Sequence, residues 1–108
     1  MIRIITVTAT LPRGYASLFS DATGNDNTGV GAFALENNTV SGNTALGYAS
    51  LVNDATGKDN TSLGAFALEN NTASENTATG YEALNSNTTG TDNTASGYVK
   101  IAFENSHR

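Results

Sequence analysis

The sequence predicts an all-β protein, a parallel β-solenoid (β-roll) of about five coils, each about 16–17 residues long and arranged as a 33-residue double repeat. Glycine recurs at a nearly constant interval, a branched aliphatic residue follows each of these glycines by four positions, and an Asn-Thr pair begins four positions before each later one. Such internal periods are typical of repeat architectures. The glycines are Gly14, Gly31, Gly47, Gly64, Gly80 and Gly97; the aliphatic residues are Leu18, Leu35, Leu51, Leu68, Leu84 and Ile101; the asparagines are Asn27, Asn43, Asn60, Asn76 and Asn93.

Residues 1–13 form the first predicted element, a strand-like lead. Its apolar residues belong to the types that favour extended backbone. The stretch lacks the longer apolar core of a standard secretory signal, so we expect another export route or a signal outside this sequence. Because an open solenoid end exposes unpaired backbone groups, we expect the lead to contact a neighbouring copy. The lead residues assigned to this contact are Ile2, Ile4, Ile5 and Val7.

Residues 14–97 form the predicted solenoid, in which two kinds of coil alternate. The coils that start at Gly14, Gly47 and Gly80 begin Gly-Tyr, and those that start at Gly31 and Gly64 begin Gly-Ala-Phe. Their Asn, Thr and Gly content disfavours a helical repeat. Each coil has room for two short extended segments and two turns, and successive coils would stack about 4.8 Å apart.

Each repeated position then becomes a column along the solenoid axis. The glycines would supply a positive φ or a close backbone approach at a corner, and the aliphatic column would fill the interior. The asparagines would pass amide hydrogen bonds from coil to coil. Strict alternation from Leu84 would point Glu82 inward, so either a bend interrupts the Gly-x-x-x-Leu segment or this column faces a neighbour.

Residues 98–108 form the last element, a strand-like tail that diverges from the repeat. Its apolar residues follow a strand pattern and do not resemble a polar cap. We therefore expect the tail, like the lead, to take part in self-association. The residues assigned to this role are Val99, Ile101 and Phe103.

Composition excludes several classes of protein. The chain has no cysteine, which rules out disulfides and thiolate metal sites. Its net charge of −5, without a Lys/Arg cluster, argues against nucleic-acid binding, and no apolar run is long enough to span a membrane. We expect no enzyme activity and no cofactor, because His107 is the only imidazole and Asp21 with Asp26 recurs as Asp54 with Asp59, which marks repeat positions.

Two weaker binding hypotheses arise from the turns and the threonines. Asp26, Asp59 and Asp92 follow glycine in equivalent turns and are weak calcium candidates, although the Gly-Gly-x-Gly-x-Asp pattern of calcium-binding rolls is absent. We therefore expect no metal site. The column that runs from Thr28 to Thr94 suggests ice binding, but its sequence neighbour is Asn and not a second Thr, so this is a lesser alternative.

The segments Gly80-Tyr-Glu-Ala-Leu84, Asn87-Thr-Thr-Gly90 and Asn93-Thr-Ala-Ser-Gly97 carry a resemblance to a known group of repeats. They resemble the head repeats of trimeric autotransporter adhesins and the related repeats of phage and bacterial tail-fibre proteins. The resemblance covers Gly14 to Gly97. It implies a left-handed parallel β-roll, often trimeric, on a cell or virion surface. The present unit is longer than the usual adhesin head repeat.

These observations favour a structural role. We expect a self-associating β-solenoid subunit of an extracellular fibre, filament or surface appendage, whose partners are copies of itself in a filament or a trimer. The alternative is an adhesion module that binds cell-surface glycans through Tyr15, Tyr48 and Tyr81.

Overall fold

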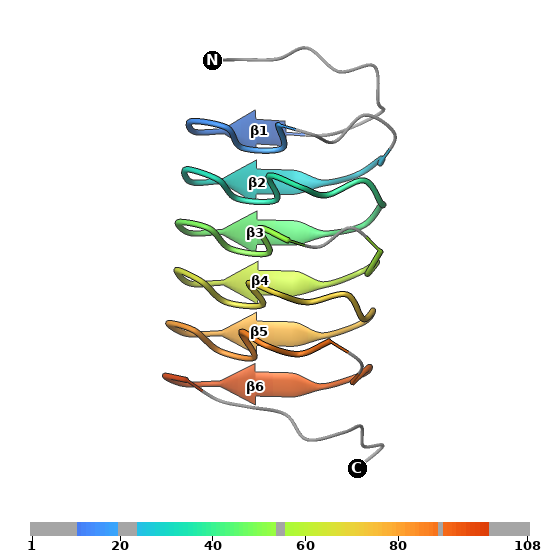
Figure 1. The fold of residues 1–108 in the computed structure, drawn as a ribbon, viewed down its shortest axis with the longest axis vertical. Helices are drawn as coiled ribbons and strands as arrows, with labels where there is room; N and C mark the ends of the chain where they lie inside the picture. The colour runs from blue at the N-terminus through green and yellow to red at the C-terminus, as the bar shows by residue number, and fades with distance from the viewer. Residues whose placement is uncertain (1–10, 20–23, 54–55, 89, 100–108) are drawn as a thin grey trace.

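The computed structural model of the chain describes residues 11–19, 24–53, 56–88 and 90–99. These residues form one parallel sheet, in which six three-residue strands follow one another in chain order (Figure 1). The strands are β1 (Leu11–Arg13), β2 (Thr28–Val30), β3 (Thr44–Leu46), β4 (Thr61–Leu63), β5 (Thr77–Thr79) and β6 (Thr94–Ser96). The predicted fold class, an all-β parallel β-solenoid, is confirmed.

The strand register reproduces the period of the sequence. Leu11 pairs with Thr28, and Thr28 pairs in turn with Thr44. The next partners along this row are Thr61, Thr77 and Thr94. Longer and shorter steps alternate along the row in the same order as the spacings of the glycines. Each coil therefore returns the chain to the same place one strand further along the axis.

The two sides of a coil differ more than the sequence suggests. We predicted two extended segments in each coil, whereas the described residues form one three-residue strand per coil. A series of tight turns follows each strand. In the coil that starts at Gly31, Ala34 N–H donates to Gly31 O at 3.2 Å and Asn38 N–H donates to Leu35 O at 3.2 Å.

These turns place non-glycine residues in the left-handed region of φ. Phe33 has a φ of 64° and Leu35 a φ of 55°, and the same two positions are left-handed in each described coil. This conformation costs about 1–2 kcal/mol per residue. It also resolves the question of Glu82, whose φ is 58°: a bend does interrupt the Gly-x-x-x-Leu segment, and Glu82 is half-buried at the surface.

The six glycines form one row at the corner that ends each strand. A Cβ added to Gly64, where φ is +134°, would lie 2.5 Å from Gly80 O, and a Cβ on Gly47 would lie 2.7 Å from the carbonyl carbon of Gly64. Real Cβ atoms do not approach backbone so closely. Close stacking of the coils at this corner therefore requires glycine at both positions, in addition to the positive φ.

The core is thin and built mostly from small side chains around one column of leucines. Leu35, Leu51 and Leu68 are fully buried, and Leu18 and Leu84 nearly so. Opposite them lie the middle residues of the strands, which include Ala45, Ser62 and Ala78. Where serine enters the core its hydroxyl is paired: Ser50 Oγ lies 2.6 Å from Ser62 Oγ, and Ser17 Oγ donates to Gly29 O at 2.8 Å.

Buried asparagines connect successive coils immediately before the strands. Asn43 N–H donates to Asn27 Oδ1 at 2.8 Å, and Asn60 N–H donates to Asn43 Oδ1 at 2.9 Å. The same bond joins Asn76 to Asn60 and Asn93 to Asn76. The side chains of Asn43 and Asn60 donate onward, from Asn43 Nδ2 to Gly57 O and from Asn60 Nδ2 to Ala73 O, both at 2.9 Å. These asparagines therefore satisfy backbone groups that the turns leave without a strand partner.

Several residues singled out from the sequence lie outside the described residues, and their predicted roles stay predictions. They are Ile2, Ile4, Ile5, Val7, Asp21, Asp54, Ile101, Phe103 and His107.

Candidate functional site

The calcium candidates lie in one exposed column that contains no assembled metal site. Asp26, Asp59 and Asp92 align with Gly42 and Glu75, and all five residues have a positive φ between 59° and 81°. Their backbones are joined across coils, for example by Glu75 N–H, which donates to Lys58 O at 2.9 Å. In the part of the chain that the structure describes, no three His, Asp or Glu side chains gather closely enough to hold a metal ion.

Stacking in this column changes the acidity of one carboxyl group. Glu75 lies between Asp59 and Asp92 in consecutive coils. A side-chain hydrogen bond to Asp92, the negative charge of Asp92 and, to a smaller extent, desolvation and the charge of Asp59 raise the pKa of Glu75. The column therefore carries unfavourable charge repulsion, which Gly42 avoids where it replaces a carboxylate in the second coil.

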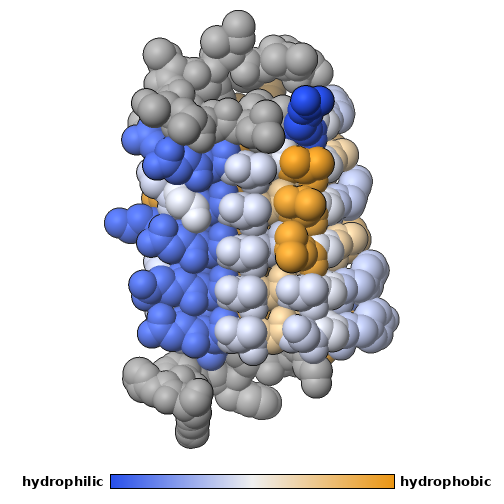
Figure 2. All heavy atoms as spheres, turned by 180° about the vertical axis from the view of Figure 1, so that it is seen from behind, coloured by the Kyte–Doolittle hydropathy of each residue, from blue (hydrophilic) through white to orange (hydrophobic). Residues whose placement is uncertain are grey.

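The outward face of the sheet is a second surface, and it carries little charge. The strands β2 to β5 direct their first and third residues outward and bury their middle residue, and in β6 the middle residue, Ala95, is partly buried. The first residues are threonines in β2 to β6, and the third residues include Val30, Leu46 and Leu63. Figure 2 shows the apolar column beside a column of intermediate hydropathy, with hydrophilic residues to one side.

This arrangement corrects one step of the sequence analysis. The neighbour of each threonine on the surface is not the preceding asparagine, because Asn27, Asn43, Asn60 and Asn76 are fully buried. The neighbour is the residue two positions later, which is aliphatic in β2, β3 and β4 and hydroxylated in β5 and β6. The threonine column itself runs unbroken from Thr28 to Thr94, whereas the column beside it is hydroxylated only at Thr79 and Ser96, so ice binding stays a lesser hypothesis.

The third surface is a continuous ladder of aromatic rings along the corner after the strands. From Tyr15 to Tyr81, tyrosines of one column alternate with phenylalanines of the next, and Tyr98 stacks on Tyr81; ring centroids lie 5.4 to 5.9 Å apart. Phe33 meets Tyr48 at 80° and Phe66 meets Tyr81 at 79°, edge to face. The rings in chain order are Tyr15, Phe33, Tyr48, Phe66, Tyr81 and Tyr98.

The tyrosines expected to bind glycans, Tyr15, Tyr48 and Tyr81, belong to this aromatic ladder and are 63%, 49% and 45% exposed. Val99, assigned to self-association, is also exposed, and its N–H donates to Tyr81 O at 2.9 Å. The alternation of Tyr and Phe columns in the sequence contained the signal for the ladder. Only the left-handed turns bring the two columns within ring contact.

The structure also contains a second column of buried asparagine side chains, which the sequence repeat did not identify. Asn38, Asn71 and Asn87 are buried, and each donates from its side chain to a backbone carbonyl two or three residues later. The clue was an asparagine three residues after Leu35, Leu68 and Leu84. Since the first coil and the third carry aspartate there, the column does not stand out as a strict repeat.

No family model, curated protein or solved structure matches this chain. Its class, a parallel β-solenoid, is therefore defined by the stacked strands and ladders alone. Among the described residues there is no helix with the length and apolar character needed to cross a membrane.

Proposed function

We propose that the protein is a non-enzymatic structural subunit that self-associates to build an extracellular fibre, filament or surface appendage. The observation that carries the proposal is the outward sheet face. Val30 and Leu46 are 37% and 41% exposed on neighbouring strands, and Leu63 continues the column. Apolar side chains exposed next to one another gain from burial against a partner, which supports this face as the contact surface.

Charge distribution supports a second copy as the partner on this face. The chain carries a net charge of −5, so two copies repel each other where carboxylates meet. The strands β1 to β6 contain one charged residue, Arg13, and no acidic residue. Contact through the sheet face therefore buries apolar side chains without bringing the acidic columns together.

The resemblance to adhesin heads and tail-fibre repeats supports the same proposal, with a trimer as the assembly. The proposed termini contacts would instead give an end-to-end filament. Adhesion through the exposed tyrosines is the alternative function, favoured by the continuous aromatic ladder. Assembly on the sheet face leaves that ladder free, so one protein can combine both roles.

Sedimentation at micromolar concentration tests the proposal. We expect the native protein to sediment as an oligomer or filament and Leu46→Glu to sediment as a folded monomer, because the new charge lies in the apolar stripe. Ser86→Glu adds the same charge at an exposed turn and should leave the assembly unchanged. A native protein that remains monomeric at these concentrations overturns the proposal. Electron microscopy of the assembled fraction distinguishes trimers from filaments.

A further inference from the structure

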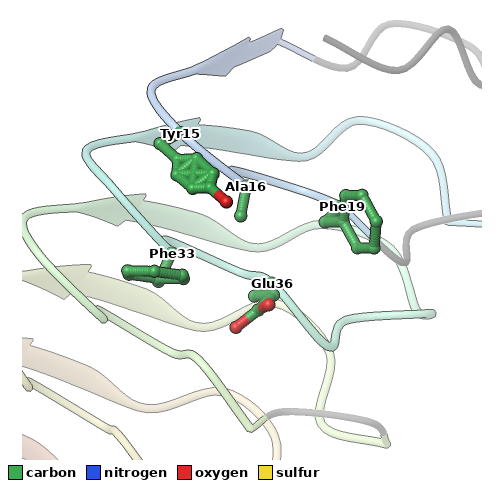
Figure 3. A pocket seen from close by; sticks show the side chains of 5 residues that line it. All are labelled: Tyr15, Ala16, Phe19, Phe33 and Glu36. Carbon is green, nitrogen blue, oxygen red and sulfur yellow. The ribbon is translucent and has the colours of Figure 1, made fainter. Parts of the chain in front are cut away.

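A cavity beside the N-terminal end of the aromatic ladder has the composition of a ligand site. Its described lining is Tyr15, Ala16, Phe19, Phe33 and Glu36, and its volume is about 320 Å³. Tyr15 and Phe33 stand on one side, Phe19 on the other, and Ala16 lies between them, with the Glu36 carboxylate below (Figure 3). This volume is at the lower end of the range for small-molecule sites.

The lining selects for charge. The aromatic rings supply polarisable apolar surface and the carboxylate of Glu36 supplies a negative charge, while no Lys or Arg is among the described lining residues. An organic cation gains from both features. A quaternary ammonium group gains most, since its methyl groups pack against the rings and it needs no hydrogen-bond acceptor.

The ring geometry selects for shape. Tyr15 and Phe33 lie 5.6 Å apart with their planes inclined by 58°. At this distance the two rings pack against each other, so together they form one wall of the pocket, and Phe19 on the opposite side forms the second (Figure 3). We propose that this cavity binds the quaternary ammonium group of a small molecule of the choline type.

The 33-residue repeat supplies internal comparisons for the proposal. One double repeat later the equivalent residues are Tyr48, Ala49, Val52, Phe66 and Glu69, so valine replaces the third aromatic ring. Glu69 Oε1 also accepts a hydrogen bond from Asn85 Nδ2 at 3.5 Å. The complete set of three rings, a small floor residue and a carboxylate therefore belongs to the first double repeat.

The third double repeat departs further. Glu82 stands where Ala16 forms the floor, and Asn85 stands where Phe19 forms a wall. A side chain as long as glutamate at the floor position reduces the space between the rings. The proposal thus predicts one site in the native protein.

Titration with choline chloride, followed by the aromatic ring resonances of Tyr and Phe, tests the site. We expect one site with a dissociation constant of about 1 mM or below. The neutral isostere 3,3-dimethylbutan-1-ol, which has the shape of choline without its charge, should bind about tenfold more weakly. Glu36→Gln should weaken choline binding by about the same factor.

Two further variants use the repeat itself as the control. Phe19→Val replaces the third aromatic ring of the first site with the valine found at the equivalent position of the second. It should weaken choline binding by about tenfold or more. Val52→Phe supplies the second site with the aromatic wall that it lacks and should raise the number of choline molecules bound per chain to two. Both variants insert a residue that the protein already carries at the equivalent position, so each should remain folded.

The outcomes separate the ligand sources. Choline binding without binding to phosphatidylcholine vesicles assigns a soluble ligand, and binding to both assigns a lipid headgroup as a second source. Equal affinity for the neutral isostere, binding of cellobiose in place of choline, or no effect of Phe19→Val overturns the proposal.

Discussion

At the residue scale, the buried asparagines show how a protein with few large apolar side chains holds its coils together. Asn43 accepts from Asn60 N–H through Oδ1 and donates through Nδ2 to Gly57 O and to Asn38 Oδ1. One side chain therefore satisfies groups in its own coil and in the next. An apolar residue of similar size would fill the space but leave these buried polar groups unpaired.

We expect Asn43→Ala to lower the free energy of unfolding by about 2–4 kcal/mol, because it removes the acceptor of a buried N–H and leaves a small cavity. Urea unfolding followed by circular dichroism measures this loss. Asn53→Ala is the matched control: Asn53 also bridges coils through its amide, to Asn37 and Asn70, but it is exposed. Its loss should stay within about 0.5 kcal/mol. Equal losses of unfolding free energy in the two variants would show that burial does not determine how strongly these hydrogen bonds stabilise the fold.

The leucine column shows what sequence patterns predict at this scale and what they miss. The spacing of Leu35 and Leu68 placed them in the interior, where they are fully buried. It contained no sign of their left-handed backbone, because leucine is uncommon there and a propensity argument assigns that region to glycine or asparagine. Burial and inter-coil hydrogen bonds, such as the one from Leu35 N–H to Ser50 O at 3.0 Å, offset the preference of leucine for a negative φ.

At the scale of the coil, the strand side and the turn side have different roles. The strand side supplies regular pairing and one nearly uncharged face. The turn side places its residues by left-handed steps, and these set the positions of the aromatic ladder and of the acidic column. The period predicted the strand side, since Thr at a fixed interval favours parallel pairing in register. The arrangement of surface side chains on the turn side could not be predicted, because the inward–outward alternation of side chains in an extended strand fails where φ changes sign.

The acidic column makes stability depend on pH in a defined direction. The pKa of Glu75 is raised in the folded state by the adjacent carboxylates, so its ionised form is disfavoured by folding. The destabilisation is present above the raised pKa and is relieved as the pH falls through it and Glu75 becomes protonated.

We therefore expect Glu75→Gln to melt at a higher temperature than the native protein at pH 7. The difference should shrink as the pH falls through the raised pKa of Glu75, and it should also shrink at pH 7 in 1 M NaCl, which screens the exposed charges. Thermal melts at a series of pH values, with and without salt, measure both effects. A difference of the same size at pH 4 and pH 7 would assign the change to packing and not to charge.

At the scale of the whole molecule, the columns separate the surface into bands that run the length of the described solenoid. The sheet face, the aromatic ladder and the acidic column each recur in every coil or every second coil. Since each coil contacts its immediate neighbours, stability in such a protein is approximately the sum of coil terms and interface terms.

Duplicating residues 47–79 tests this additivity. The insertion adds one odd and one even coil and preserves every column, so we expect a single unfolding transition with a larger urea m-value and a higher melting temperature. Duplicating residues 64–79 alone places two Phe66 coils and two Glu75 carboxylates in succession and should stabilise less per added coil. Two separate transitions after the 33-residue insertion would contradict the additive description.

The alternation of longer and shorter coils limits how the length of such a solenoid can change in evolution. Gain or loss of one double repeat alters its reach by about 9.6 Å and leaves the cross-section, the ring contacts and the spacing of like charges unchanged. Adding or removing whole 33-residue repeats therefore changes the length of the solenoid and keeps every column, whereas adding or removing a single coil places two coils of the same kind side by side.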